Sequence, residues 1–263
     1  MKDDIDNYTT YNKRMSASLI DKVFFVDKIP ADVAVIVDYG CADGTLIAFI
    51  RTFFPDAVLI GYDQDPTMTE LARLREGNQN SEFYSSWDKV QSRINSIQGK
   101  KVVVASSIIH EVYSYGTHED SLKFWNHLYS LKSGFDYICI RDMMVSMAVD
   151  RPSDINDVVK VLRKYHRTKA LLDFQANWGS IESNKNLVHF LLKYRYMEPN
   201  WEREVKENYL PLYREDFLAM IPDEYGILFH EHYALPYLKQ AVKADMGVIL
   251  KDPTHIKIIL AKG

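Results

Sequence analysis

Residues 33–68, VAVIVDYGCADGTLIAFIRTFFPDAVLIGYDQDPTM, decide the fold of this chain. Their first apolar run, 33–37, is typical of a strand that is buried on both faces. A turn containing Gly40 and Gly44 follows, then an apolar helical face and a second apolar run, 57–62. The stretch therefore predicts a strand, a glycine-bearing turn, a helix and a second, parallel strand.

An acidic residue at the end of each predicted strand suggests that this unit binds a nucleotide. Asp38 precedes the glycine turn, and Asp63 follows the second strand, 23 positions after Gly40. In nucleotide-binding βαβ units, an acidic residue about 20 positions further on reaches the ribose hydroxyls. Glycines let the backbone turn tightly and approach a ligand. We therefore expect Asp63 to bind a ribose.

Residues 38–44, DYGCADG, resemble the first motif of the class I, Rossmann-like methyltransferases that depend on S-adenosylmethionine (SAM). That motif is acid-x-Gly-x-Gly-x-Gly, and here Ala42 replaces the middle glycine. An NAD-dependent oxidoreductase is an alternative, but its G-x-G-x-x-G is absent. A non-catalytic SAM-binding or scaffolding module within a complex is another. The resemblance covers roughly residues 30–145 and, more loosely, 210–263.

The resemblance implies an α/β fold with a doubly wound, mostly parallel seven-stranded sheet and a helical insertion after strand 5. Apolar runs that alternate with helical patterns agree with this fold. The last two strands are expected to form an antiparallel pair at one edge. The expected divisions are an N-terminal helical cap (1–30), a SAM-binding core (31–145), a helical insertion or lid (146–212) and a C-terminal helix with the antiparallel strand pair (213–263).

The cofactor is expected along the carboxyl ends of the parallel strands, where ligands bind in such sheets. Trp87 follows the third predicted strand, where it could stack on the adenine, or it could be a core residue at a helix start. The residues that the resemblance assigns to SAM are Asp38, Tyr39, Gly40, Cys41, Ala42, Gly44, Asp63, Gln64, Met68, Ser86, Trp87, Ser106 and Ser107.

Residues 108–116, IIHEVYSYG, leave the fourth strand at the same edge and carry the candidate catalytic groups. Most methyl acceptors lose a proton as they attack, and a histidine has a pKa suited to accepting it near neutral pH. We expect His110 to be a general base, with Glu111 beside it. Residues expected to contact the substrate are Tyr11, Arg14, Tyr113, Tyr115, Asp142 and Trp201.

The methyl acceptor remains open between a nucleic acid or nucleotide and a small molecule. A basic cluster in the insertion could bind phosphates, although such runs are commonly solvated helix faces. The net charge of −4 argues against a surface covered with nucleic-acid-binding groups. The cluster consists of Arg163, Lys164, Arg167 and Lys169.

Composition indicates a cytoplasmic globular protein with neither disulfides nor a metal site. Apolar residues make up 47% and charged residues 26%, as in soluble domains. The two cysteines, Cys41 and Cys139, cannot form a disulfide framework, and no cysteine pair has metal-ligand spacing. The acidic, polar N-terminus does not resemble a signal peptide, and no apolar run approaches 18 residues.

Overall fold

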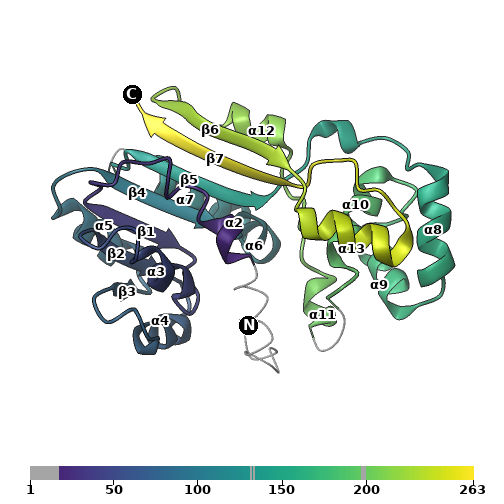
Figure 1. Ribbon diagram of the computed structural model, residues 1–263, viewed down its shortest axis with the longest axis horizontal. Helices are drawn as coiled ribbons and strands as arrows, with labels where there is room; N and C mark the ends of the chain where they lie inside the picture. The colour runs from purple at the N-terminus through teal and green to yellow at the C-terminus, as the bar shows by residue number, and fades with distance from the viewer. Residues whose placement is uncertain (1–17, 131, 133, 197–199) are drawn as a thin grey trace.

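The computed structural model describes residues 18–130, 132, 134–196 and 200–263, and it contains a seven-stranded sheet (Figure 1). The strands are β1 (Val35–Tyr39), β2 (Val58–Tyr62), β3 (Glu82–Tyr84), β4 (Lys101–Ser106), β5 (Tyr137–Met143), β6 (Tyr225–Tyr233) and β7 (His255–Lys262). Their order in the sheet is β3-β2-β1-β4-β5-β7-β6. Neighbours among β1 to β5 are parallel, whereas β7 is antiparallel to both β5 and β6. The predicted class I methyltransferase fold is therefore confirmed.

Helices cover both faces of the sheet because its strands are apolar on both sides. One face packs against α2 (Leu19–Lys22), α3 (Thr45–Ile50) and α4 (Pro66–Leu74). The other packs against α5 (Trp87–Asn95), α6 (Ile109–Tyr115), α7 (His118–Tyr129) and α12 (Arg214–Ala219). Every residue of β1 is buried, as the apolar run predicted. No helix among the described residues is long and apolar enough to span a membrane.

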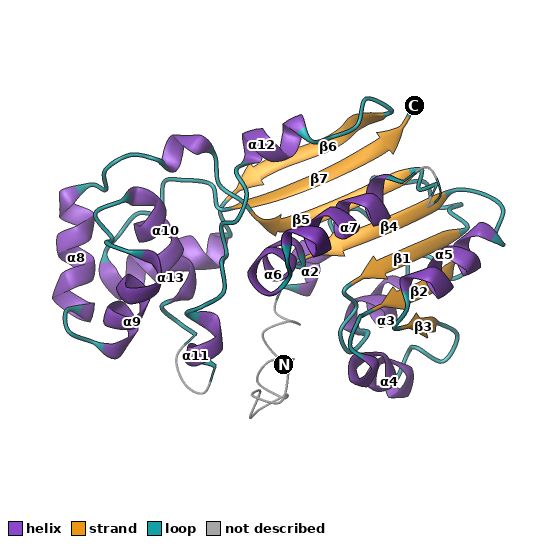
Figure 2. Cartoon of the chain, turned by 180° about the vertical axis from the view of Figure 1, so that it is seen from behind, coloured by secondary structure: helices purple, strands orange, loops and turns teal. Residues whose placement is uncertain are grey.

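The helical insertion is built from two separate segments of the chain. Its first segment holds a 3-10 turn, η1 (Met147–Val149), and the helices α8 (Ile155–Tyr165), α9 (Lys169–Trp178), α10 (Asn184–Lys193) and α11 (Trp201–Glu204). The second segment is α13 (Pro236–Met246), between β6 and β7, with the residues after it. The apolar face of α13, including Leu238 and Val242, is buried in the same core as α8 and α10. Figures 1 and 2 show this body beside one end of the sheet.

The glycine turn after β1 depends on left-handed backbone conformations. Gly40 has φ +80° and Gly44 has φ +73°, and Ala42 between them also has a positive φ, +45°. A Cβ atom on Gly40 would lie 2.7 Å from Cδ1 of Ile108, and one on Gly44 would lie 2.9 Å from Cβ of Ala72. In this structure the two glycines therefore allow close packing of the turn against the chain itself.

We predict that Gly44→Ala destabilises the protein more than Gly247→Ala. Both glycines have φ near +70°, so both substitutions incur the left-handed penalty of about 1–2 kcal/mol. At Gly247 the nearest atom to a new Cβ is 4.0 Å away, whereas at Gly44 the clash should add roughly 1–3 kcal/mol. Chemical denaturation measures the free energy of unfolding of each variant. Equal losses would show that the turn can relax around an extra methyl group.

Candidate functional site

The register of β1 and β2 brings the glycine turn and Asp63 together. Tyr39 lies opposite Tyr62, so the residues that follow these strands are neighbours. The buried Asp63 carboxylate accepts hydrogen bonds from the backbone N–H groups of Ala42 and Asp65, each at 3.0 Å. Asp63 therefore holds the turn at the carboxyl edge of the sheet.

The turn is also fixed from its other side by Asp43. The Asp43 carboxylate accepts hydrogen bonds from the backbone and hydroxyl of Thr45 and forms an ion pair with Arg75. Arg75 Nε donates to the backbone carbonyl of Asp43 at 2.8 Å. The backbone of the turn is therefore held in place before any ligand binds.

Two buried polar groups lie at this edge of the sheet and fit a polar ligand. Ser106, the last residue of β4, has a buried hydroxyl without a hydrogen-bond partner among the described residues. Buried polar groups without partners are rare and often mark a ligand site. Burial raises the pKa of Asp38 to about 7, even though the charge of Lys22 on α2 lowers it. The edge therefore offers a hydroxyl and a carboxyl group beside the glycine turn.

Several residues that the sequence assigned to the cofactor have side chains in the core. The Tyr39 hydroxyl lies 3.0 Å from His127 Nδ1, and the Trp87 ring stacks on His127 with ring centroids 4.5 Å apart. This packing agrees with the alternative that Trp87 is a core residue. Ser107 accepts a hydrogen bond from Arg141 at 2.8 Å. Of the others, Cys41 and Met68 are buried, Ser86 is the N-cap residue of α5, and Gln64 is exposed.

His110 is held by a carboxylate from the neighbouring strand. Helix α6 begins directly beyond β4, and Asp142 lies near the end of β5. Asp142 is 0% exposed and accepts hydrogen bonds from His110 Nδ1 at 2.6 Å and from the Ile109 backbone N–H at 2.7 Å. Because the partner is a carboxylate, Nδ1 carries a proton and Nε2 points away from Asp142.

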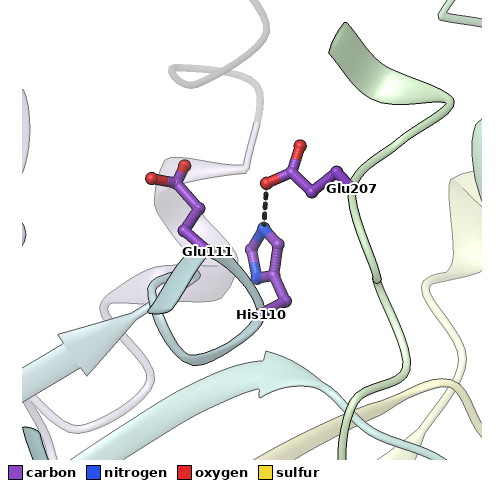
Figure 3. Close-up of side chains that lie close together, drawn as sticks. All are labelled: His110, Glu111 and Glu207. Carbon is purple, nitrogen blue, oxygen red and sulfur yellow. Dashed lines mark ion pairs between the residues drawn. The ribbon is translucent and has the colours of Figure 1, made fainter. Parts of the chain in front are cut away.

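Glu207 faces the other ring nitrogen of His110. Its Oε1 lies 3.5 Å from His110 Nε2, and Figure 3 shows it reaching the ring from a separate segment of the chain. Glu207 follows α11 in the insertion and is only 2% exposed. Sequence reasoning missed Glu207, because it lies 96 positions after Glu111 and belongs to no local motif.

The segment that carries Glu207 is fixed by a buried lysine. Lys193 Nζ donates to the backbone carbonyl of Glu207 at 2.5 Å and to that of Glu204 at the end of α11. Lysine side chains commonly satisfy the last carbonyls of a helix in this way. The backbone N–H of Asn208 donates to Ser114 Oγ on α6 at 2.7 Å. The insertion is thus attached to the core at the helix that carries His110.

Electrostatics favour a charged His110 between two carboxylates. Burial alone lowers the pKa of His110, but the charge and hydrogen bond of Asp142, with the charges of Glu207 and Glu111, raise it to about 9. Burial raises the pKa of Glu207, whereas the charge of His110 lowers it. The charges of the two carboxylates therefore favour an imidazolium between them at neutral pH.

Glu111 lies beside this pair and also faces Arg203 of α11. The distance from Arg203 Nη2 to Glu111 Oε1 is 3.7 Å, and Arg203 Nε donates to the Tyr115 hydroxyl at 3.1 Å. One side-chain atom each of His110, Glu111 and Glu207 lies within 4.8 Å of the other two.

The structure changes two of the predicted substrate contacts. Asp142 is 0% exposed, and its carboxylate is hydrogen-bonded to His110. Trp201 is 1% exposed and lies in the core of the insertion, where its Nε1 donates to Asp173 at 3.0 Å. Tyr113 accepts a hydrogen bond from Trp125 Nε1, whereas Tyr115 is 38% exposed beside Arg203. The remaining two, Tyr11 and Arg14, lie outside the described residues.

The basic cluster of the insertion is partly paired. Lys169 forms ion pairs with Asp173 and Glu202, and Lys164 donates to the backbone carbonyl of Asp245. In Figures 1 and 2, α8 lies on the far side of the insertion from α6. Arg163 and Arg167, the other two members, are exposed. This placement favours the alternative of a solvated helix face.

Comparisons with known proteins show likeness at the level of structure only. No family model matches the chain, and no curated protein sequence is significantly similar to it. Similar solved structures include the plantazolicin methyltransferase BamL in complex with a triazolic desmethylPZN analog and SAH (12% identity, 98% of this chain and 88% of that chain, TM-score 0.46). Others are the mitomycin 7-O-methyltransferase MmcR (15%, 96% and 56%, 0.48) and PKMT2 from Rickettsia typhi in complex with AdoHcy (15%, 94% and 52%, 0.49).

We predict that the stabilisation provided by His110 depends on pH. Its pKa rises from an ordinary value of 6.5 to about 9 on folding, so the folded state binds the proton more tightly. The loss of stability in His110→Gln should therefore be largest below pH 6.5 and should decrease as the pH rises toward 9. Denaturation at several pH values measures it, with the exposed His166→Gln as control. A loss that is the same at every pH would contradict a charged His110.

Proposed function

We propose that this protein is a methyltransferase that uses SAM as the methyl donor. The observation that carries the proposal is the junction of the Gly40–Gly44 turn with Asp63 at the carboxyl edge of a class I methyltransferase sheet. In doubly wound sheets, ligands bind beyond the carboxyl ends of the strands. SAM, when bound, supplies an electrophilic methyl group on a sulfonium that leaves as a neutral thioether.

The residues at this edge fit the parts of that cofactor. Asp63, at the end of β2, would accept hydrogen bonds from the two ribose hydroxyls through its carboxylate oxygens. The preformed turn of Gly40, Ala42 and Gly44 would lie against the cofactor. The unpartnered hydroxyl of Ser106 would gain a polar partner there. Asp38 would orient the cofactor or the turn, as the resemblance implies.

The arrangement around His110 favours an enzyme over a non-catalytic SAM-binding module. A module that only binds SAM does not need an imidazole held between Asp142 and Glu207 at the edge where the cofactor would bind. Burying charged groups costs desolvation free energy, and such groups are concentrated at functional sites. The acceptor would reach this pair past the partly exposed Tyr115, Glu111 and Arg203. Because Lys164 and Lys169 of the basic cluster are engaged with other groups of the chain, we propose a small acceptor and not a nucleic acid.

We predict that Asp63→Asn weakens SAM binding at least tenfold, whereas Asp65→Asn leaves it within a few-fold. Asp63→Asn removes the charge that would strengthen two hydrogen bonds to the ribose, each contributing roughly 1.5–3 kcal/mol. Asp65 is the N-cap residue of α4, a position at which asparagine serves equally well. Isothermal titration calorimetry with SAM measures both variants. Wild-type affinity in Asp63→Asn would place the ribose elsewhere.

A further inference from the structure

The protons on His110 limit what this residue can do. Its Nδ1–H is donated to Asp142 at 2.6 Å, and its Nε2 faces the carboxylate of Glu207 at 3.5 Å. One proton is shared by Nε2 and Glu207, and we place it on Nε2, because the charges of Asp142, Glu207 and Glu111 raise the pKa of His110 above that of Glu207. An imidazolium has two N–H donors and no lone pair with which to accept a proton. His110 in this state can donate a hydrogen bond to an acceptor, but it cannot deprotonate it.

Glu207 has the free lone pairs that His110 lacks. Its Oε1 is buried and accepts no hydrogen bond from the residues that the structure describes. Keeping an ionised carboxylate out of water is costly, and taking up a proton relieves that cost. Burial accordingly raises the pKa of Glu207, as expected of a base that works near neutral pH.

Other charged groups near Glu207 are already engaged with different partners. Lys193 of α10 donates to backbone carbonyls and not to the Glu207 carboxylate. Arg203 of α11 donates a hydrogen bond to the Tyr115 hydroxyl and forms an ion pair with Glu111, and both of these residues belong to α6. The remaining neighbour, Glu204, accepts a hydrogen bond from Tyr209. His110 is therefore the cation that directly faces Glu207 Oε1.

We infer that Glu207 is the catalytic base of this methyltransferase, that His110 is a charged hydrogen-bond donor, and that the acceptor is a hydroxyl group. A hydroxyl placed alongside both groups would accept a hydrogen bond from His110 Nε2–H and donate one to Glu207 Oε1. A neutral amine has a single lone pair, which a hydrogen bond from His110 would occupy and keep from attacking the methyl group, and a thiolate has no proton for the second bond. This inference rests on the proposed function and replaces the expectation that His110 is the base.

The transfer step balances in protons and electrons. A lone pair of the hydroxyl oxygen forms the bond to the methyl carbon of SAM. The carbon–sulfur bond breaks, and its electrons remain on sulfur, which becomes a neutral thioether. The hydroxyl proton moves to Glu207 Oε1, and His110 stabilises the oxygen without changing its own protonation. A positioned base contributes about 10²–10⁴ in rate in such steps.

Nuclear magnetic resonance of the ¹⁵N-labelled histidine rings in the full chain tests the assignment of the protons. We expect both ring nitrogens of His110 to carry protons at neutral pH in the wild type. In Glu207→Gln the pKa of His110 should fall by roughly one unit or more, because an opposite charge is lost. Glu202→Gln, an exposed glutamate of the same helical segment, should behave like the wild type. A wild-type Nε2 without a proton, whether bare or bound to a metal ion, would overturn the inference.

The same spectra test the class of acceptor. Phenol, added to the protein with S-adenosylhomocysteine, should shift the Nε2–H signal of His110, whereas benzene of similar size should not. An equal effect of the two probes, or no effect of either, would exclude a hydroxyl from this position. Calorimetry with S-adenosylhomocysteine on the same samples separates the two proposals. If S-adenosylhomocysteine failed to bind, the proposed function would be contradicted. The protons of His110 are measured without any cofactor, so that result does not depend on the proposed function.

Discussion

The buried carboxylate of Asp142 is the constraint on which the arrangement of the site depends. It accepts hydrogen bonds from His110 Nδ1, from the first backbone N–H of α6 and from the backbone N–H of Met143. Burial alone raises the pKa of Asp142, but these bonds lower it, so the carboxyl group stays ionised inside the protein. One charge thereby joins the end of β5 to the start of α6 and orients the imidazole. Removing it would leave a buried imidazole without its partner, a large penalty.

The helical insertion completes this site and does more than cover it. Lys193 and Ser114 fix the segment that follows α11, and this segment places Glu207 against His110. The interaction is reciprocal, because the charge on His110 stabilises the ionised form of Glu207 and the charge on Glu207 stabilises the imidazolium. Separation of the insertion from α6 would remove both effects. Docking of the insertion and the protonation of the His110–Glu207 pair are therefore thermodynamically linked.

The sequence predicted the fold and the cofactor edge because both depend on local patterns. Residues 33–68 contain a strand, its turn and the next acidic residue in order, and parallel pairing brings Gly40 beside Asp63. Residues that meet through long-range packing were missed. Glu207 reaches His110 only through the fold of the insertion. Trp201 is buried in the core of the insertion, but the sequence did not predict this. The sequence pattern around an aromatic residue in a polar segment is the same whether the residue lines a cleft or packs in a core.

The central claim is that the edge formed by the glycine turn and Asp63 binds SAM. Calorimetric titration of the purified wild-type protein with S-adenosylhomocysteine, and separately with NAD, tests it most directly. The account predicts that S-adenosylhomocysteine binds at one site per chain and that NAD does not bind, because the chain has no G-x-G-x-x-G turn for its pyrophosphate. Binding of NAD in place of S-adenosylhomocysteine, or of neither, would contradict the account.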